Sequence, residues 1–134
     1  MKRTLGLIAT MFASLFLLAS PAGAERLASG GFSNQAQRIT GSWSIEREAD
    51  GVYLVLSSDF RTRSAPDLKF FLHTLPASQI TAQNATRGVF VGDLPNARGA
   101  QRIRLPANID PARFRSLVLH CEQYTVLWGA GDLH

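Results

Sequence analysis

The sequence predicts an all-β protein: an antiparallel β-sandwich or small barrel of about seven strands, preceded by a cleaved signal peptide. Three observations support this prediction. Apolar and polar residues alternate with a period of two in segment after segment, which is typical of half-buried strands. Residues that favour turns recur roughly every ten residues. No segment has a convincing helical period, and the 134 residues contain no internal repeat, which favours one domain beyond the signal.

Residues 1–24 are typical of a secretory signal peptide. Lys2 and Arg3 give a positive start, an apolar stretch follows, and small residues at Ala22 and Ala24 predict cleavage after Ala24. The apolar stretch is short for a bilayer span, which needs about 20 residues. We therefore expect a periplasmic or secreted protein with no stable membrane anchor after signal cleavage.

The mature chain is expected to form a polar leader loop over residues 25–38 and a single domain over residues 39–134. The domain starts with a predicted antiparallel hairpin, whose turn carries the signal Asp50-Gly51. The apolar residues that alternate along its two strands are Trp43 and Ile45 in the first, and Val52, Leu54 and Leu56 in the second.

Further strands follow along the chain. Because Pro66 has no N–H to donate to a strand ladder, the third strand is expected after it. Its two faces carry Leu68, Phe70 and Leu72 on one side and Lys69, Phe71 and His73 on the other. Residues 77–88 are expected to form a loop or one short helical turn, and residues 106–114 a crossing loop. The remaining predicted strands cover residues 88–94, 101–105, 116–121 and 124–130.

Cys121 is the only cysteine, so no intramolecular disulfide can form and the fold must rest on its hydrophobic core. It ends an apolar strand and precedes the polar residues Glu122 and Gln123. A free cysteine is usually a small buried hydrophobe. At a strand end, however, a thiol can also reach solvent or a cofactor, so a packing role and a redox role both stay open.

The histidines do not form a recognisable metal motif. His120 neighbours Cys121, but their side chains point apart on a regular strand, so no metal site is predicted. A blue-copper site usually adds an axial methionine, and both methionines lie in the signal. A single cysteine also excludes covalent haem attachment through Cys-x-x-Cys-His. Non-covalent haem held by His73, His120 or Cys121 remains an alternative, so the cofactor is unknown.

The other candidate groups are explained by structural roles or by chance. Asp59 and Asp67 flank one loop, where turn and cap chemistry explains them without a catalytic pair. Asn84 begins a glycosylation sequon of a kind that is common by chance. No nucleophile–base motif is present, so whether the protein is an enzyme is left open, and a stand-alone enzyme is not favoured.

The charge pattern is mildly basic. The formal net charge is +4, and two of the positive charges lie in the signal. Lys69 is the only lysine of the mature chain, and the arginines are scattered along it, which favours a solvated face over an anion patch. No nucleic-acid partner is expected. The scattered arginines include Arg63, Arg87, Arg98, Arg102, Arg104, Arg113 and Arg115.

Four stretches of the mature chain form a further pattern. They are GSWSI at 41–45, APDL at 65–68, GDL at 92–94 and SLVLHCEQYTVLWGA at 116–130. Together they resemble the DM-thirteen domain family, also called the electron-transfer DM-thirteen domain, which often occurs beside DOMON domains. The resemblance covers residues 32–133 and is most specific in the last stretch. His120 stands where the family usually has tryptophan, and Ala65 stands for glycine.

The resemblance implies a β-sandwich-like domain with a redox role centred on its cysteine, which is Cys121 in this chain. His120 would place a titratable ring beside the thiol, as a candidate cofactor-binding residue. The residues that support the motif are Pro66, Asp67, Tyr124 and Trp128.

Two functions follow from these observations. The first is an exported redox or electron-transfer domain, in which Cys121 acts through sulfenic acid, a mixed disulfide or a bound cofactor with a redox partner protein or envelope component. The alternative is a non-enzymatic binding module in which Cys121 packs in the core. Loops at residues 59–67 or 84–88 would then meet a partner protein or an envelope glycan.

Overall fold

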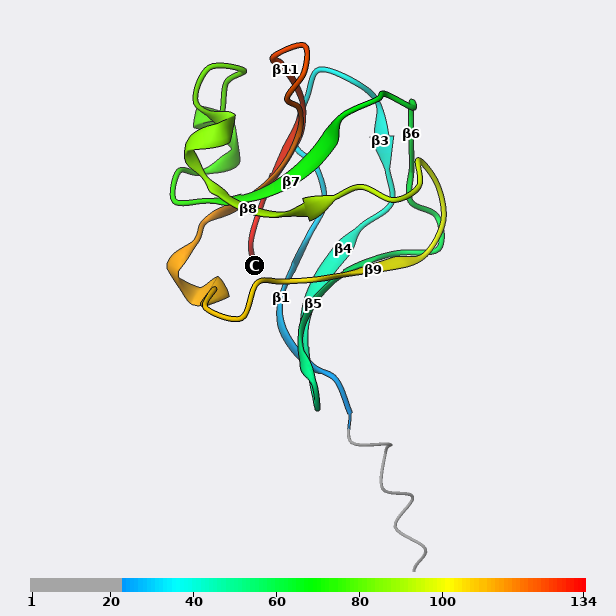
Figure 1. The fold of residues 1–134 in the computed structure, drawn as a ribbon, viewed down its shortest axis with the longest axis vertical. Coiled ribbons are helices and arrows are strands. Elements are labelled where there is room, and N and C mark those ends of the chain that lie inside the picture. Colours follow the sequence, from blue (N-terminus) through cyan, green and yellow to red (C-terminus); the bar gives the residue numbers. More distant parts are fainter. Residues whose placement is uncertain (1–22) are drawn as a thin grey trace, which may run out of the picture.

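The computed structural model describes residues 23–134 (Figure 1). The predicted signal peptide therefore lies almost entirely outside the described residues. Within the part that is described, no helix is long and apolar enough to cross a bilayer.

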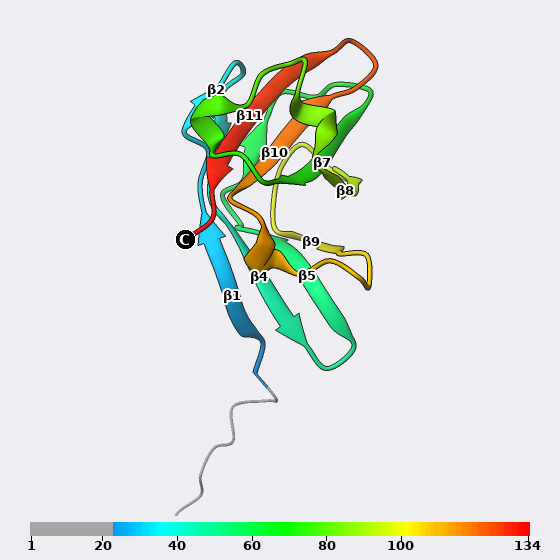
Figure 2. The same ribbon diagram turned by 90° about the vertical axis from the view of Figure 1, so that its left-hand side faces the viewer.

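Two antiparallel sheets stack as separate layers (Figure 2). The four-stranded sheet has the order β1 (Glu25–Gly30), β4 (Trp43–Glu48), β5 (Gly51–Leu56) and β9 (Gln101–Arg104). The five-stranded sheet has the order β2 (Asn34–Gln35), β11 (Val126–Asp132), β10 (Ser116–Cys121), β7 (Leu68–His73) and β8 (Val89–Asp93). A two-stranded ribbon joins β3 (Ile39–Thr40) to β6 (Arg61–Thr62). The prediction of an all-β antiparallel fold is confirmed, in its sandwich form.

The main core fills the space between the two sheets and follows the predicted alternation. Trp43 and Ile45 of β4 are buried, and Ser44 between them is only half-buried. Leu54 and Leu56 of β5 face the same core, and their strand pairs with β4 around the predicted Asp50-Gly51 turn. The facing sheet contributes Leu68, Phe70, Leu72, Leu117, Leu119, Cys121 and Trp128.

A second, smaller core covers the outer face of the five-stranded sheet. Phe71 and Val118 lie on this face, opposite the residues that enter the main core. Residues 77–88 pack over them as two 3-10 helices, η1 (Ala77–Gln79) and η2 (Ala85–Arg87), where the sequence predicted a loop or one helical turn. Because β10 is covered on both faces, every residue in it is buried.

The amino-terminal segment differs from the expected leader loop. Residues 25–30 form β1, which pairs antiparallel with β4, and residues 34–35 form β2 beside β11. Backbone bonds in both directions between Ser29 and His134 tie the segment to the end of the chain. Backbone pairing at a sheet edge holds β1, and only Ala28 of that strand is buried, so its apolar pattern is too weak to predict a strand.

Candidate functional site

The thiol of Cys121 lies in the main core at the end of β10. Cys121 pairs with Leu68 of β7 on one side and with Val126 of β11 on the other. Its side chain is 1% exposed and packs with the apolar residues between the sheets. It shares that face with Leu117 and Leu119, as the alternation predicted. A thiol held in this way is shielded from reagents while the strand end stays closed.

His120 points to the opposite face of β10 and does not join Cys121 in one site. Its ring contacts Phe71 edge-on, with 6.5 Å between the ring centroids. Across the strands it pairs with Lys69 of β7 and Leu127 of β11, at a register shift that follows Leu119. Cys121 and His120 therefore lie on opposite faces of β10, one in the main core and the other against the outer layer.

The His120 ring is buried with an unused nitrogen. The residue is 1% exposed, and among the described residues its Nδ1 has no hydrogen-bond partner. Burial lowers the pKa of His120, because desolvation disfavours the imidazolium, while the nearby carboxylates of Glu122 and Asp67 oppose that shift. Burial therefore favours the neutral form of the ring.

A charged cluster borders the end of β10. Lys69 Nζ lies 2.5 Å from Glu122 and 3.4 Å from Asp67. The hydrogen bond to Glu122 raises the pKa of Lys69, and the carboxylate of Asp67 adds to this effect. The backbone N–H of Glu122 also donates to the carbonyl of Asp67 at 3.2 Å. The cluster therefore ties the start of the β10–β11 turn to the residue before β7.

The turn between β10 and β11 is the exposed edge of this region. Residues 122–125 are all exposed, and Thr125 adopts a left-handed backbone conformation with φ of 51°. That conformation is unfavourable for a β-branched residue. One backbone bond closes the turn, from the N–H of Thr125 to the carbonyl of Glu122 at 3.2 Å. Cys121 lies directly before this strained turn.

The residues that support the motif fall in different places. Tyr124 lies in the turn and is 62% exposed, and Pro66 is exposed one residue before Asp67. Trp128 is buried on β11, and its Nε1–H donates to Thr62 Oγ1 at 2.8 Å. Tyr124 and Asp67 thus lie near the strand end of Cys121, whereas Trp128 anchors the β3–β6 ribbon.

The remaining histidines and carboxylates do not converge on the thiol. Both ring nitrogens of His73 are engaged: the backbone N–H of Leu75 reaches Nδ1 at 3.1 Å, and Nε2 lies 3.0 Å from the carbonyl of Asn84. Asp59 accepts a hydrogen bond from Ser57 in its own loop. Within the described residues, no group of three or more His, Cys, Asp or Glu side chains is placed to hold a metal ion.

Sequence reasoning missed the ion pair between Lys69 and Glu122 beside the strand end of Cys121. A signal was present, since Lys69 is the only lysine among the described residues and faces away from the main core on its strand. The register that sets it opposite His120 could not be read from spacing alone.

These features define a small antiparallel β-sandwich domain with a single buried thiol at a strand end beside a charged turn. The chain belongs to the electron transfer DM13 family, which matches residues 31–133. Separate comparisons with curated proteins and with solved structures found no match. The family therefore assigns the chain to an electron-transfer-related class.

Proposed function

We propose that this domain transfers electrons in an exported protein and that Cys121 is its redox group. The observation that carries the proposal is the position of the one cysteine. It lies inside the family match, directly before an exposed and strained turn. The predicted export signal supports a periplasmic or secreted location. Detection outside the cytoplasm of a mature chain that begins at Glu25 would test this location.

The proposed chemistry is thiol–disulfide exchange with a partner protein. Cys121 loses its proton to water, and its sulfur attacks one sulfur of the partner's disulfide. A new S–S bond forms to that sulfur, the partner's S–S bond breaks, and the second sulfur leaves as a thiolate with the electron pair. A thiolate of a second partner then attacks the first partner's sulfur in the mixed disulfide. A disulfide forms between the two partners, and the bond to Cys121 breaks, which releases the Cys121 thiolate with the electron pair. With one cysteine in the chain, both steps are intermolecular.

The exchange needs the strand end to open, because Cys121 is shielded in the closed structure. The groups that hold the turn are few: the Glu122–Lys69 ion pair and the two backbone bonds made by Glu122. Partly exposed ion pairs contribute little stability, so we expect this turn to open without global unfolding.

Incubation of the folded mature protein with glutathione disulfide tests this function. We expect one glutathione adduct at Cys121, seen as a mass increase that dithiothreitol reverses, and none on Cys121→Ser. Adduct formation only in denaturant concentrations that unfold the whole domain would contradict the proposal.

The second candidate is a non-enzymatic binding module, and the burial of Cys121 favours it. Its side chain packs with the main core as an ordinary small hydrophobe would. In that case Cys121→Ala leaves partner binding and cellular phenotype unchanged and lowers only thermal stability. Loss of the phenotype in a folded Cys121→Ala variant would exclude the module and favour electron transfer.

Bound cofactors are tested separately. An absorbance spectrum of the protein purified from its native host reveals a haem or coloured metal centre, for which His120 is the candidate ligand. The Nδ1 of His120 is the one buried side-chain polar atom left unpaired among the described residues. His120→Phe therefore serves as the variant that should lose any cofactor bound through this ring. A colourless, metal-free protein contradicts cofactor binding.

A further inference from the structure

A hollow lined by arginines lies beside the β3–β6 ribbon. Its volume is about 790 Å³, within the range of small-molecule sites. Cys121 does not line it, and the ribbon is separate from both large sheets. The charged residues that line it are Arg38, Arg61, Arg63 and Arg98, and the polar ones include Thr40 and Ser64.

Strand register explains why these arginines gather. Ile39 pairs with Thr62, and both are buried, so this pair points into the molecule. Alternation then turns Arg38 and Arg61 outward on the other face of the ribbon. Arg63 follows Arg61 with the same period. An isolated bridge sets Arg98 directly beside Arg61. The sequence prediction favoured a solvated face because the arginines are scattered along the chain.

The floor of the hollow is held firmly. Thr62 Oγ1 donates to the carbonyl of Arg38 at 3.1 Å and accepts from Trp128 Nε1 at 2.8 Å. The N–H of Thr62 donates to the carbonyl of Ala97, and the N–H of Gly99 donates to the carbonyl of Phe60, each at 2.8 Å. The backbones that carry the arginines are therefore fixed before any ligand arrives.

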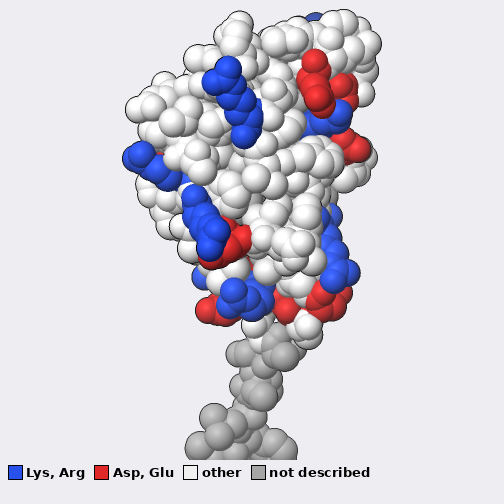
Figure 3. All heavy atoms as spheres, turned by 60° about the vertical axis from the view of Figure 1, so that its left-hand side comes forward, with Lys and Arg blue, Asp and Glu red and all other residues white. Residues whose placement is uncertain are grey.

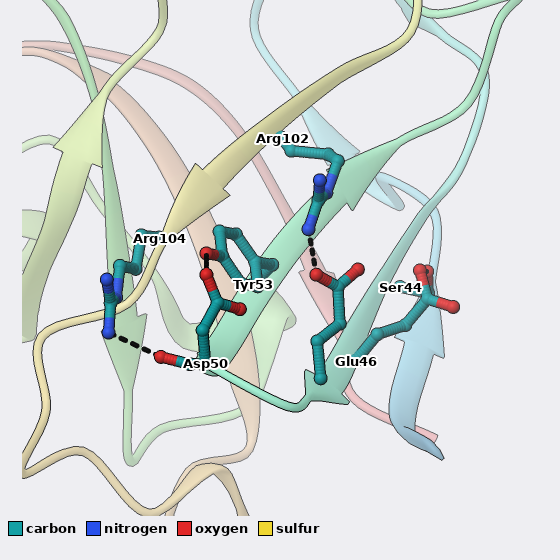
Figure 4. Close-up of polar contacts among 7 residues, drawn as sticks. Ser44, Glu46, Asp50, Tyr53, Arg102 and Arg104 are labelled. Carbon is teal, nitrogen blue, oxygen red and sulfur yellow. Dashed lines mark hydrogen bonds and ion pairs between the residues drawn. The ribbon is translucent and has the colours of Figure 1, made fainter. Parts of the chain in front are cut away.

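Several arginines elsewhere in the described residues have partners. Arg102 pairs with Glu48 and lies over the ring of Tyr53. Arg104 donates to the carbonyl of Asp50 (Figure 4). On the face shown in Figure 3, basic and acidic side chains lie beside one another in several places.

The hollow differs from these places. In the described part of the chain, its four arginines make no ion pair with a carboxylate. Asp59 is the acid nearest to them in sequence, and it does not line the hollow. Four exposed guanidinium groups thus share one concave surface without a counter-charge.

We propose that this hollow binds a small molecule with two or more phosphate or carboxylate groups. Guanidinium groups match the geometry of both anions through paired N–H donors. The hollow is large for one inorganic phosphate, and four arginines on a fixed floor suit several anionic groups at once. The site goes beyond the proposed electron transfer and does not depend on Cys121.

Isothermal titration with tripolyphosphate and with citrate, in low-salt buffer free of phosphate, tests the site. We expect binding of one ligand per chain that weakens as ionic strength rises. Arg61→Gln with Arg98→Gln removes two guanidinium groups and lowers the affinity at least ~10-fold. Amide NMR shifts caused by the ligand are expected at residues 38–40, 61–64 and 97–98.

The matched control is Arg87→Gln with Arg113→Gln, which removes the same charge from exposed positions outside the hollow. This control retains the affinity within ~2-fold. Equal weakening by the two double variants would mean general charge attraction and would overturn the proposal. The absence of binding to the wild-type protein by both probes up to about 1 mM, a weak affinity, would overturn it as well.

Discussion

His120 and Cys121 show at the residue scale how one strand serves two layers. The thiol enters the main core, whereas the imidazole lies against Phe71 on the outer face. A buried polar atom without a partner costs free energy, so the unpaired Nδ1 of His120 is expected to lower the free energy of unfolding. Lys69 lies opposite His120 on β7, and the carboxylates of Glu122 and Asp67 oppose the lowering of the pKa of His120.

The stability of the protein should fall as the pH drops below the ordinary histidine pKa of 6.5. The folded pKa of His120 is lowered, so the unfolded chain takes up the proton first and the free energy of unfolding declines from pH 6.5 toward the folded pKa. The contribution is fully present above pH 6.5. Urea denaturation from about pH 8 to pH 5 measures it.

His120→Phe removes the titrating group and the unpaired nitrogen. This variant should keep the stability at neutral pH within about 1.5 kcal/mol and flatten the decline at low pH. His134→Gln is the control, since His134 is exposed, and it should retain the decline. An unchanged pH profile in His120→Phe would contradict the account.

The β3–β6 ribbon shows at the element scale how a pair of two-residue strands can be held. The buried hydroxyl of Thr62 stabilises the ribbon, because it accepts from the indole N–H of Trp128 and donates to the carbonyl of Arg38. These bonds fix the ribbon to β11 and so fix the floor of the arginine hollow. Strands this short have no readable alternation, which is why the sequence pattern predicts about seven strands and misses the shortest ones.

Thr62→Val keeps the shape of the side chain but removes both hydrogen bonds. The indole N–H of buried Trp128 loses its acceptor, so we expect a loss of about 1–3 kcal/mol in the free energy of unfolding. Thr40→Val, whose hydroxyl makes only long bonds of 3.3 and 3.5 Å, should lose less. Denaturant unfolding measures both variants, and equal losses would contradict this role of Thr62.

Sequence patterns predict the whole molecule well where one face of a strand is buried. The alternation in β4, β5 and β7 predicted which residues enter the core, and Asp50-Gly51 predicted their turn. β1 could not be predicted, because its pairing rests on the backbone. The candidate site was predicted only in part: Cys121 was found by its uniqueness, but its burial and its ion-pair neighbours depend on register.

The whole-molecule account rests on local opening at the end of β10. Glu122→Gln removes the ion pair with Lys69 and should speed the opening by ~2- to 5-fold while barely changing global stability. Arg113→Gln, which breaks the longer and more exposed pair with Asp110 away from this turn, should leave the opening unchanged.

The most direct measurement is the rate at which iodoacetamide alkylates Cys121 in the folded mature protein, followed by mass at increasing urea. Labelling by local opening has a rate that is almost flat at low urea and exceeds the rate of global unfolding. That result, with faster labelling of Glu122→Gln than of Arg113→Gln, is the one we predict. A labelling rate that follows global unfolding at every urea concentration would contradict the proposed redox role of Cys121 and leave it a packing residue.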